Sequence, residues 1–303
     1  MKLPWLEIFK RKRAESPPVV LPPLEGTDDN AFYQITDDSG NVLDDATRMV
    51  VPLFSYPTKP GDPVRMLGTG FFIAPRLIAT AKHVVDEVLD RTAPDGLVRQ
   101  KSALMTMVRR SNSSAFEERR IHIVSTVDGC DVAVCQVDAG SRCEKCAPLR
   151  ISKAEVGETV FTFAFPNTEI VDRDGKHVLV TNPAFYRGEV VEYYPEGRDK
   201  YLLSWPLYHV DFHMHPGASG GPVFDRSGFV IGINCASMEP ERSIAYVTDI
   251  ENVKHAVVSN VTYGNKPPMN MTIGEMIKNS YIDPFPQLKG KAVFKHVNKI
   301  NLL

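Results

Sequence analysis

The sequence predicts an all-β protein made of two β units, and three observations support this. After the first 45 or so residues, short runs rich in Val, Ile, Phe and Tyr alternate with Pro, Gly, Asp and Asn, as in strands joined by turns. The runs fall into two sets, separated by a connector with prolines and charges near residues 139–150. Only one late segment, 249–261, has helical spacing. With 303 residues, the chain is long enough to give each unit its own core.

The first unit is expected over residues 46–140. Its apolar runs are bounded by turn residues at the spacing of a barrel or a sandwich. The expected strands are 48–55, 64–75, 76–81, 102–110, 119–127 and 131–137.

The second unit is expected over residues 141–263. In 249–261, Asp249 is a possible N-cap, and apolar residues follow near helical spacing, which predicts a short helix that closes this unit. The expected strands are 159–166, 184–194, 201–212, 221–225, 228–237 and 243–249.

The two ends have a different composition. Residues 1–45 join a basic cluster to proline-rich and acidic stretches, which bury little apolar surface, so we expect a flexible tail. Residues 264–303 have no strong period and form either a wrapping extension or a partner-binding tail. The two ends therefore suggest a regulatory partner, or an oligomer held together through the tails.

Composition excludes several classes of partner. Lys plus Arg number 35 against 37 for Asp plus Glu, so the charge balance gives no reason to expect nucleic acid. No apolar run is long enough for a membrane span, and the N-terminal stretch lacks the order of a secretory signal. The five cysteines are odd in number and bunched, which favours free thiols in a reducing compartment. We therefore expect a cytoplasmic protein.

A set of three residues could carry nucleophilic catalysis. Ser219 lies among glycines in "HPGASGGPVFD", where the turn would expose its hydroxyl and could aim the N–H groups of Gly217 and Ser219 at a developing oxyanion. A serine also needs a base and a group to orient that base. His83 directly follows a strand-like run in "LIATAKHVV", and Asp131 heads an apolar strand in "CDVAVCQV". The order His, Asp, Ser is that of the chymotrypsin arrangement.

Three blocks of the sequence resemble trypsin/chymotrypsin-like serine peptidases: "GTGFFIAPRLIATAKHVV", "CDVAVCQVD" and "HPGASGGPVFDRSGFVIGIN". They are most similar to the bacterial, disulfide-free HtrA-like branch. Because only residues 264–303 follow the expected helix, we do not expect the PDZ domain of that branch. The resemblance implies two six-stranded antiparallel β-barrels with a short C-terminal helix. It also implies a serine endopeptidase that acts on a peptide or protein, with His83 as general base, Asp131 as its partner, Ser219 as nucleophile, and Gly217 and Ser219 as the oxyanion hole.

The sequence departs from this family pattern at two positions. Ala218 stands where many members carry Asp or Asn, so the trypsin-type activation, in which a freed N-terminal amine pairs with that acid, has no partner here. Val84 stands where secreted relatives have a cysteine, which agrees with a cytoplasmic protein.

The resemblance also implies a pocket for the substrate side chain. Because position 213 holds a histidine and not an acid, a preference for Lys or Arg is not expected. The hypothesis is a polar or acidic substrate side chain that accepts a hydrogen bond from His213. The pocket residues implied are His213, Asn234, Cys235, Ala236 and Ser243.

Two alternatives compete with these interpretations. Histidines at period two in "HVDFHMH" could bind zinc, but no Cys or Glu set accompanies them at a recognised spacing. "CEKC" is half of a zinc site that Cys130 and Cys135 could complete, but the place of these two beside Asp131 favours small buried residues on a core strand. We therefore expect no metal and no cofactor. The other alternative is a catalytically weak or latent scaffold of the same fold that binds peptides or protein partners.

Overall fold

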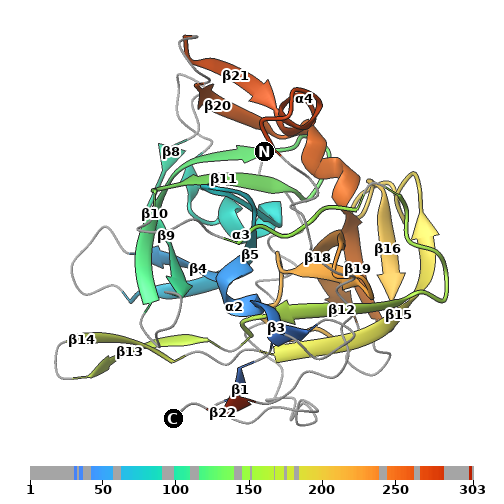
Figure 1. Cartoon of the computed structure of the whole chain (residues 1–303), viewed down its shortest axis with the longest axis horizontal. Coiled ribbons are helices and arrows are strands. Elements are labelled where there is room, and N and C mark those ends of the chain that lie inside the picture. The colour runs from blue at the N-terminus through green and yellow to red at the C-terminus, as the bar shows by residue number, and fades with distance from the viewer. Residues whose placement is uncertain are drawn as a thin grey trace.

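The computed structural model consists mainly of two closed, six-stranded antiparallel β-barrels, which confirms the predicted fold class (Figure 1). It describes residues 31–32, 34–36, 42–56, 63–90, 99–109, 116–139, 145–150, 152–166, 168–173, 176–180, 184–238, 244–262, 267–282 and 300–301.

The first barrel has the strand order β10-β11-β6-β5-β4-β9. Its valine- and isoleucine-rich strands place β-branched side chains on the buried face, as expected for a pleated surface that packs against a core. The strands are β4 (Val50–Tyr56), β5 (Arg65–Ala74), β6 (Leu77–Thr80), β9 (Ala103–Arg109), β10 (Phe116–Thr126) and β11 (Ala133–Val137). The short helix α3 (Lys82–Asp86) follows β6 after a single residue.

The second barrel has the order β12-β15-β16-β19-β18-β17. Its strands are β12 (Thr159–Ala164), β15 (Ala184–Tyr194), β16 (Leu207–Val210), β17 (Pro222–Asp225), β18 (Val230–Met238) and β19 (Ile244–Asp249). The strand expected over 201–212 is shorter in the structure, because residues 201–206 form bends before β16 begins.

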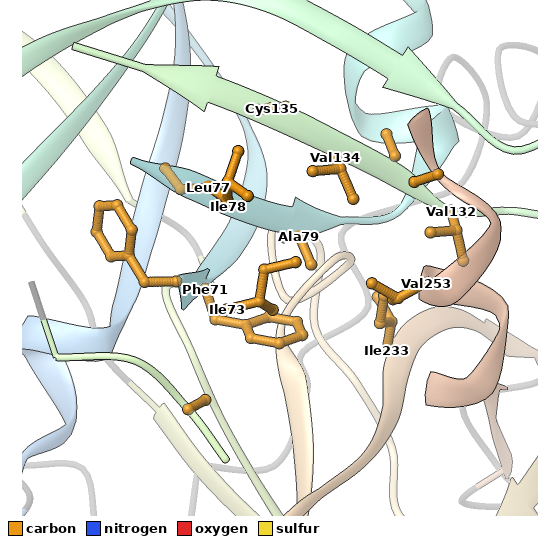
Figure 2. Packing of buried hydrophobic residues seen from close by; sticks show 14 of the residues in the cluster. Phe71, Ile73, Leu77, Ile78, Ala79, Val132, Val134, Cys135, Ile233 and Val253 are labelled. Carbon is orange, nitrogen blue, oxygen red and sulfur yellow. The ribbon is translucent and has the colours of Figure 1, made fainter. Parts of the chain in front are cut away.

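The connector and a continuous apolar cluster hold the barrels together. The N–H of Ala147 donates to the carbonyl of Phe72 at 2.8 Å, and Leu149 bridges to Val230 of the second barrel. Figure 2 shows side chains of β5, β6 and β11 in one cluster with Ile233 of β18 and Val253. The interface between the barrels is thus part of the hydrophobic core.

The expected closing helix is only partly helical. Asp249 does cap the segment, accepting a hydrogen bond from the N–H of Glu251 at 3.0 Å, but the 3₁₀-helix η2 (Ile250–His255) ends early. Val257 and Val258 lie instead on strand β20 (Val257–Val261), which pairs with β21 (Met269–Thr272). Because Val257 and Val258 pair with β21, they are extended and do not continue the helix.

The hairpin formed by β20 and β21 packs against β10 and β11 of the first barrel, above which it lies in Figure 1. The side-chain amide of Gln136 on β11 accepts from and donates to the backbone of Ser259, at 3.3 and 2.9 Å. Helix α4 (Ile273–Lys278) follows, with a capping box formed by Thr272 and Glu275. Residues 267–282 of the expected C-terminal extension are therefore folded onto the molecule, with Met271, Ile273 and Met276 in the shared apolar cluster.

Small elements complete the described residues. They are β1 (Ala31–Phe32) paired with β22 (Ile300–Asn301), β2 (Gln34–Thr36) with β3 (Val42–Asp45), α2 (Ala46–Met49), β7 (Leu89–Asp90) with β8 (Arg99–Gln100), and β13 (Glu169–Arg173) with β14 (Lys176–Val180). No helix among the described residues is long and apolar enough to cross a membrane.

Candidate active site

His83 is positioned by the turn from β6 into α3. Ala81 occupies the N-cap position but has no side chain to cap the helix. The Asp131 carboxylate takes this role, because its Oδ1 accepts the N–H of His83 at 2.9 Å while its Oδ2 lies 2.8 Å from the ring Nδ1. The His83 side chain stays 24% exposed, against 7% for Asp131, so the imidazole is accessible while the carboxylate is shielded.

The charge on this pair follows from its contacts. Burial raises the pKa of Asp131, but the neighbouring His83, the thiol of Cys235 and the His83 N–H together lower it below its usual value. Burial lowers the pKa of His83, but Asp131, followed by Asp86 and Glu87, outweighs burial and raises it above 6.5. Since the Asp131 carboxylate is ionised and only accepts hydrogen bonds, Nδ1 carries a proton, and the lone pair of the neutral ring lies on Nε2.

Ser219 lies in a turn whose backbone requires glycine. Gly217 has φ of 96° and follows Pro216, and the N–H of Ala218 closes the turn on the carbonyl of His215 at 3.1 Å, as a type II turn requires. Gly220 has φ of 85°, also in the left-handed region. The glycines on both sides of Ser219 therefore permit this turn, in which Ser219 is partly exposed.

The turn with Ser219 packs directly against the first barrel. The N–H of Thr69 donates to the carbonyl of Ser219 at 2.8 Å. A Cβ on Gly68 would come within 2.8 Å of that carbonyl and of the Val84 side chain, which follows His83. A Cβ on Gly220 would lie 2.1 Å from Oγ1 of Thr80, three residues before His83. The fold thus brings the Ser219 turn and the His83 turn together across the barrel interface.

Two N–H groups of this turn remain available. Within the described part of the chain, neither Gly217 nor Ser219 donates its N–H to another protein group, and both residues are partly exposed. The intervening residue, Ala218, is fully buried. The turn therefore presents two unengaged donors on its accessible side.

The residues implied for a substrate pocket have different positions. Asn234 is fully buried beneath the turn, with its amide nitrogen bound to Thr162 Oγ1 at 2.7 Å and to the Ala218 carbonyl at 3.3 Å. The buried Cys235 contacts Asp131 through its thiol. Ala236 is partly exposed, and Ser243 lies outside the described residues.

His213 belongs to a polar cluster near the start of the turn. Its Nδ1 lies 3.1 Å from Oγ of Ser237, and its ring packs edge-on against His215 with centroids 5.5 Å apart. His215 Nδ1 in turn lies 3.1 Å from the hydroxyl of Tyr186. Burial lowers the pKa of both histidines, so they are neutral at pH 7.

The described residues contain no arranged metal site. Among the residues that the structure describes, no group of three or more His, Cys, Asp or Glu side chains is arranged to hold a metal ion. Cys143 of "CEKC" falls outside the described ranges, while Cys130, Cys135 and Cys235 are free thiols.

Two contacts of this site were not predicted from the sequence. Thr69, which bonds to the Ser219 turn, stands between Gly68 and Gly70, and glycine inside a strand indicates that another backbone approaches closely. That signal was available. The contact between Cys235 and Asp131 had no sequence signal, because it depends on how β18 and the start of β11 meet across the barrels.

Comparisons with known proteins agree with this geometry. The family model described as "Trypsin-like peptidase domain" matches residues 68–233, more than half of the chain, and includes His83, Asp131 and Ser219. The uncharacterized protein y4bJ of Sinorhizobium fredii is 26% identical over 192 residues, which are 63% of this chain but only 25% of that protein.

Solved structures that resemble the chain are more distant in sequence. Deg5 is 20% identical with a TM-score of 0.48, covering 68% of this chain and 86% of its own. The active form of the Rv3671c protease from M. tuberculosis is 18% identical with a TM-score of 0.47, covering 78% and 91%. On the family match, and in agreement with the three sequence blocks, the chain belongs to the trypsin-like peptidase domain family.

Proposed function

We propose that the protein is a serine endopeptidase with Ser219 as nucleophile, His83 as general base and Asp131 as the group that orients the base. The observation that carries this proposal is the double hydrogen bond of Asp131 to the backbone and the ring of His83. It holds the imidazole in the tautomer whose Nε2 can accept a proton, which is the function of the acid in a Ser-His-Asp triad.

In the proposed reaction, the Ser219 oxygen forms a bond to the peptide carbonyl carbon while its proton passes to Nε2 of His83. The tetrahedral intermediate collapses, the C–N bond breaks, and His83 gives that proton to the leaving amine. Water then attacks the acyl-enzyme while one of its protons passes to His83, and His83 gives that proton to the Ser219 oxygen as the carboxylic acid is released. Two acyl transfers thus replace one direct hydrolysis.

The oxyanion formed in each step needs donors already in place. The N–H groups of Gly217 and Ser219 meet this requirement, because they flank the nucleophile and donate to no other described group. We assign them as the oxyanion hole.

Substrate selection is assigned to His213 and its partner Ser237, with Ala236 nearby. Ser237 Oγ donates its one proton to the Ile244 carbonyl at 3.0 Å and accepts the N–H of Met214 at 3.4 Å, so Nδ1 of His213 must donate to it. Neutral His213 then offers Nε2 as an acceptor, the reverse of the donor role expected from the sequence. This suits a substrate side chain that donates, such as a carboxamide. A carboxylate would require the protonated ring.

Labelling with a fluorophosphonate, together with peptide-library cleavage, tests the proposed activity. We expect covalent labelling and cleavage by the wild-type chain, and loss of both in Ser219→Ala, with turnover reduced on the order of 10⁶-fold when the three residues act as a unit. Ser227→Ala, in the exposed turn after β17, is a matched serine control that should keep both activities. Peptide binding without labelling or cleavage would instead support the scaffold alternative.

A further inference from the structure

Thr69 makes four hydrogen bonds at the junction of the barrels. It is fully buried on β5. Its hydroxyl donates to the carbonyl of Gly217 at 2.8 Å and accepts the N–H of Phe165, which follows β12, at 3.2 Å. Its own N–H donates to the Ser219 carbonyl at 2.8 Å, and its carbonyl accepts Oγ1 of Thr80 at 2.7 Å. One side chain of the first barrel thus binds two parts of the second.

The same turn is held from beneath by the second barrel. The amide nitrogen of Asn234 donates to the Ala218 carbonyl at 3.3 Å, and the N–H of Gly221 donates to that carbonyl at 3.1 Å. The carbonyls of three consecutive residues, 217, 218 and 219, therefore all accept hydrogen bonds from donors of the protein interior.

This arrangement sets the direction of the proposed oxyanion donors. In a trans peptide unit the C=O and N–H point in opposite directions. Because the Ala218 carbonyl is directed to Asn234, the N–H of Ser219 points to the opposite, accessible side. The Thr69 hydroxyl binds the Gly217 carbonyl and so fixes the peptide plane between residues 217 and 218. This restrains the orientation of Gly217 itself.

We infer that Thr69 is a positioning residue for the oxyanion hole, because its hydroxyl anchors the turn that contains Ser219. Ala218 lacks a carboxylate and cannot anchor this turn itself. This inference rests on the proposed function. It also means that the docking of the barrels controls the site, because the hydroxyl bridges Gly217 and the end of β12.

The test compares Thr69→Val, which keeps the shape and removes the hydroxyl, with Thr69→Ser, which keeps the hydroxyl. Thr106→Val is the matched control, because Thr106 is equally buried in the same barrel and its Oγ1 also donates to a backbone carbonyl, that of Pro52, at 2.9 Å. Removing one oxyanion-hole donor costs about 10²–10³ in kcat. We expect Thr69→Val to lose kcat on this order with little change in KM, and Thr69→Ser and Thr106→Val to stay within a few-fold of wild type.

A second measurement does not depend on activity. Amide hydrogen exchange over residues 217–221 should be faster in Thr69→Val than in wild type and unchanged in Thr106→Val. If Thr69→Val does not fold, Thr69→Ala, which leaves space for a water molecule, replaces it in both measurements. Wild-type kcat in the hydroxyl-free variant, or an equal loss in Thr106→Val, would overturn the inference. A wild-type chain that never hydrolyses peptide would refute the proposed function, while the exchange comparison would still decide whether Thr69 holds the turn.

Discussion

The Asp131 carboxylate binds His83 twice, with one oxygen 2.9 Å from the backbone N–H and the other 2.8 Å from Nδ1 of the ring. The backbone bond fixes where α3 begins, and the ring bond fixes how the imidazole is turned. A single buried side chain thereby sets both the position and the tautomer of His83.

Replacing Asp131 with Asn should leave the fold intact but lower kcat by about 10⁴-fold, the loss known for this change in the chymotrypsin arrangement. The amide can donate to Nδ1 and so stabilise the tautomer whose proton lies on Nε2. Asp138→Asn is the control, because Asp138 also binds a histidine, His122 at 2.5 Å, but both are exposed. Steady-state hydrolysis of one peptide substrate by the three proteins is the measurement. Equal activity of the two variants would contradict the assigned role.

The pH dependence of kcat/KM should report His83. Its pKa is raised above 6.5, and only the neutral ring can accept the Ser219 proton, so kcat/KM should fall as the pH drops through a midpoint above 6.5. In Asp131→Asn the residual activity should have a lower midpoint, because the burial that lowers the pKa is then unopposed by the carboxylate. A pH profile that is the same in both proteins would count against the pair.

Gly220→Ala should destabilise the fold severely. The added Cβ would lie 2.1 Å from Thr80 Oγ1 and 2.2 Å from the Thr69 carbonyl, and the residue has φ of 85°. Gly129→Ala is the control, because Gly129 has φ of 69° but nothing lies within 4 Å of the added Cβ. This substitution should cost only the strain of a side chain in the left-handed backbone region, about 1–2 kcal/mol. We expect Gly220→Ala to lose about 4 kcal/mol or more in urea unfolding. Similar losses in both variants would show that the barrels tolerate extra volume there.

His213 should select a substrate side chain that donates a hydrogen bond. At pH 8 we expect kcat/KM to be higher for peptides with Gln than for those with Glu before the cleaved bond. The Gln/Glu ratio should fall toward pH 5, since protonation of His213 turns Nε2 into a donor. Using a ratio cancels the loss of activity caused by His83. His213→Asp should shift cleavage toward Lys and Arg, and unaltered cleavage sites in that variant would remove His213 from the pocket.

Much of the architecture could be predicted because it depends on local pattern. The alternation of β-branched and turn residues predicted two sets of strands, and Asp249 correctly marked the start of η2. Val257 and Val258 were misleading, because apolar spacing near a helix end does not reveal that β21, further along the chain, will pair with them. The roles of His83, Asp131 and Ser219 remain proposals that the experiments above test.

The sequence by itself determined the all-β class, the division into two units and the order of the three motif blocks. Strand periodicity and glycine turns depend on residues that are close together in the chain. Only the tertiary structure decided that Thr69 binds Gly217, 148 positions away, and that Cys235 contacts Asp131. The physical reason is that such hydrogen bonds depend on how closed barrels pack against each other. That packing comes from a core shared by many side chains, and no single motif encodes it.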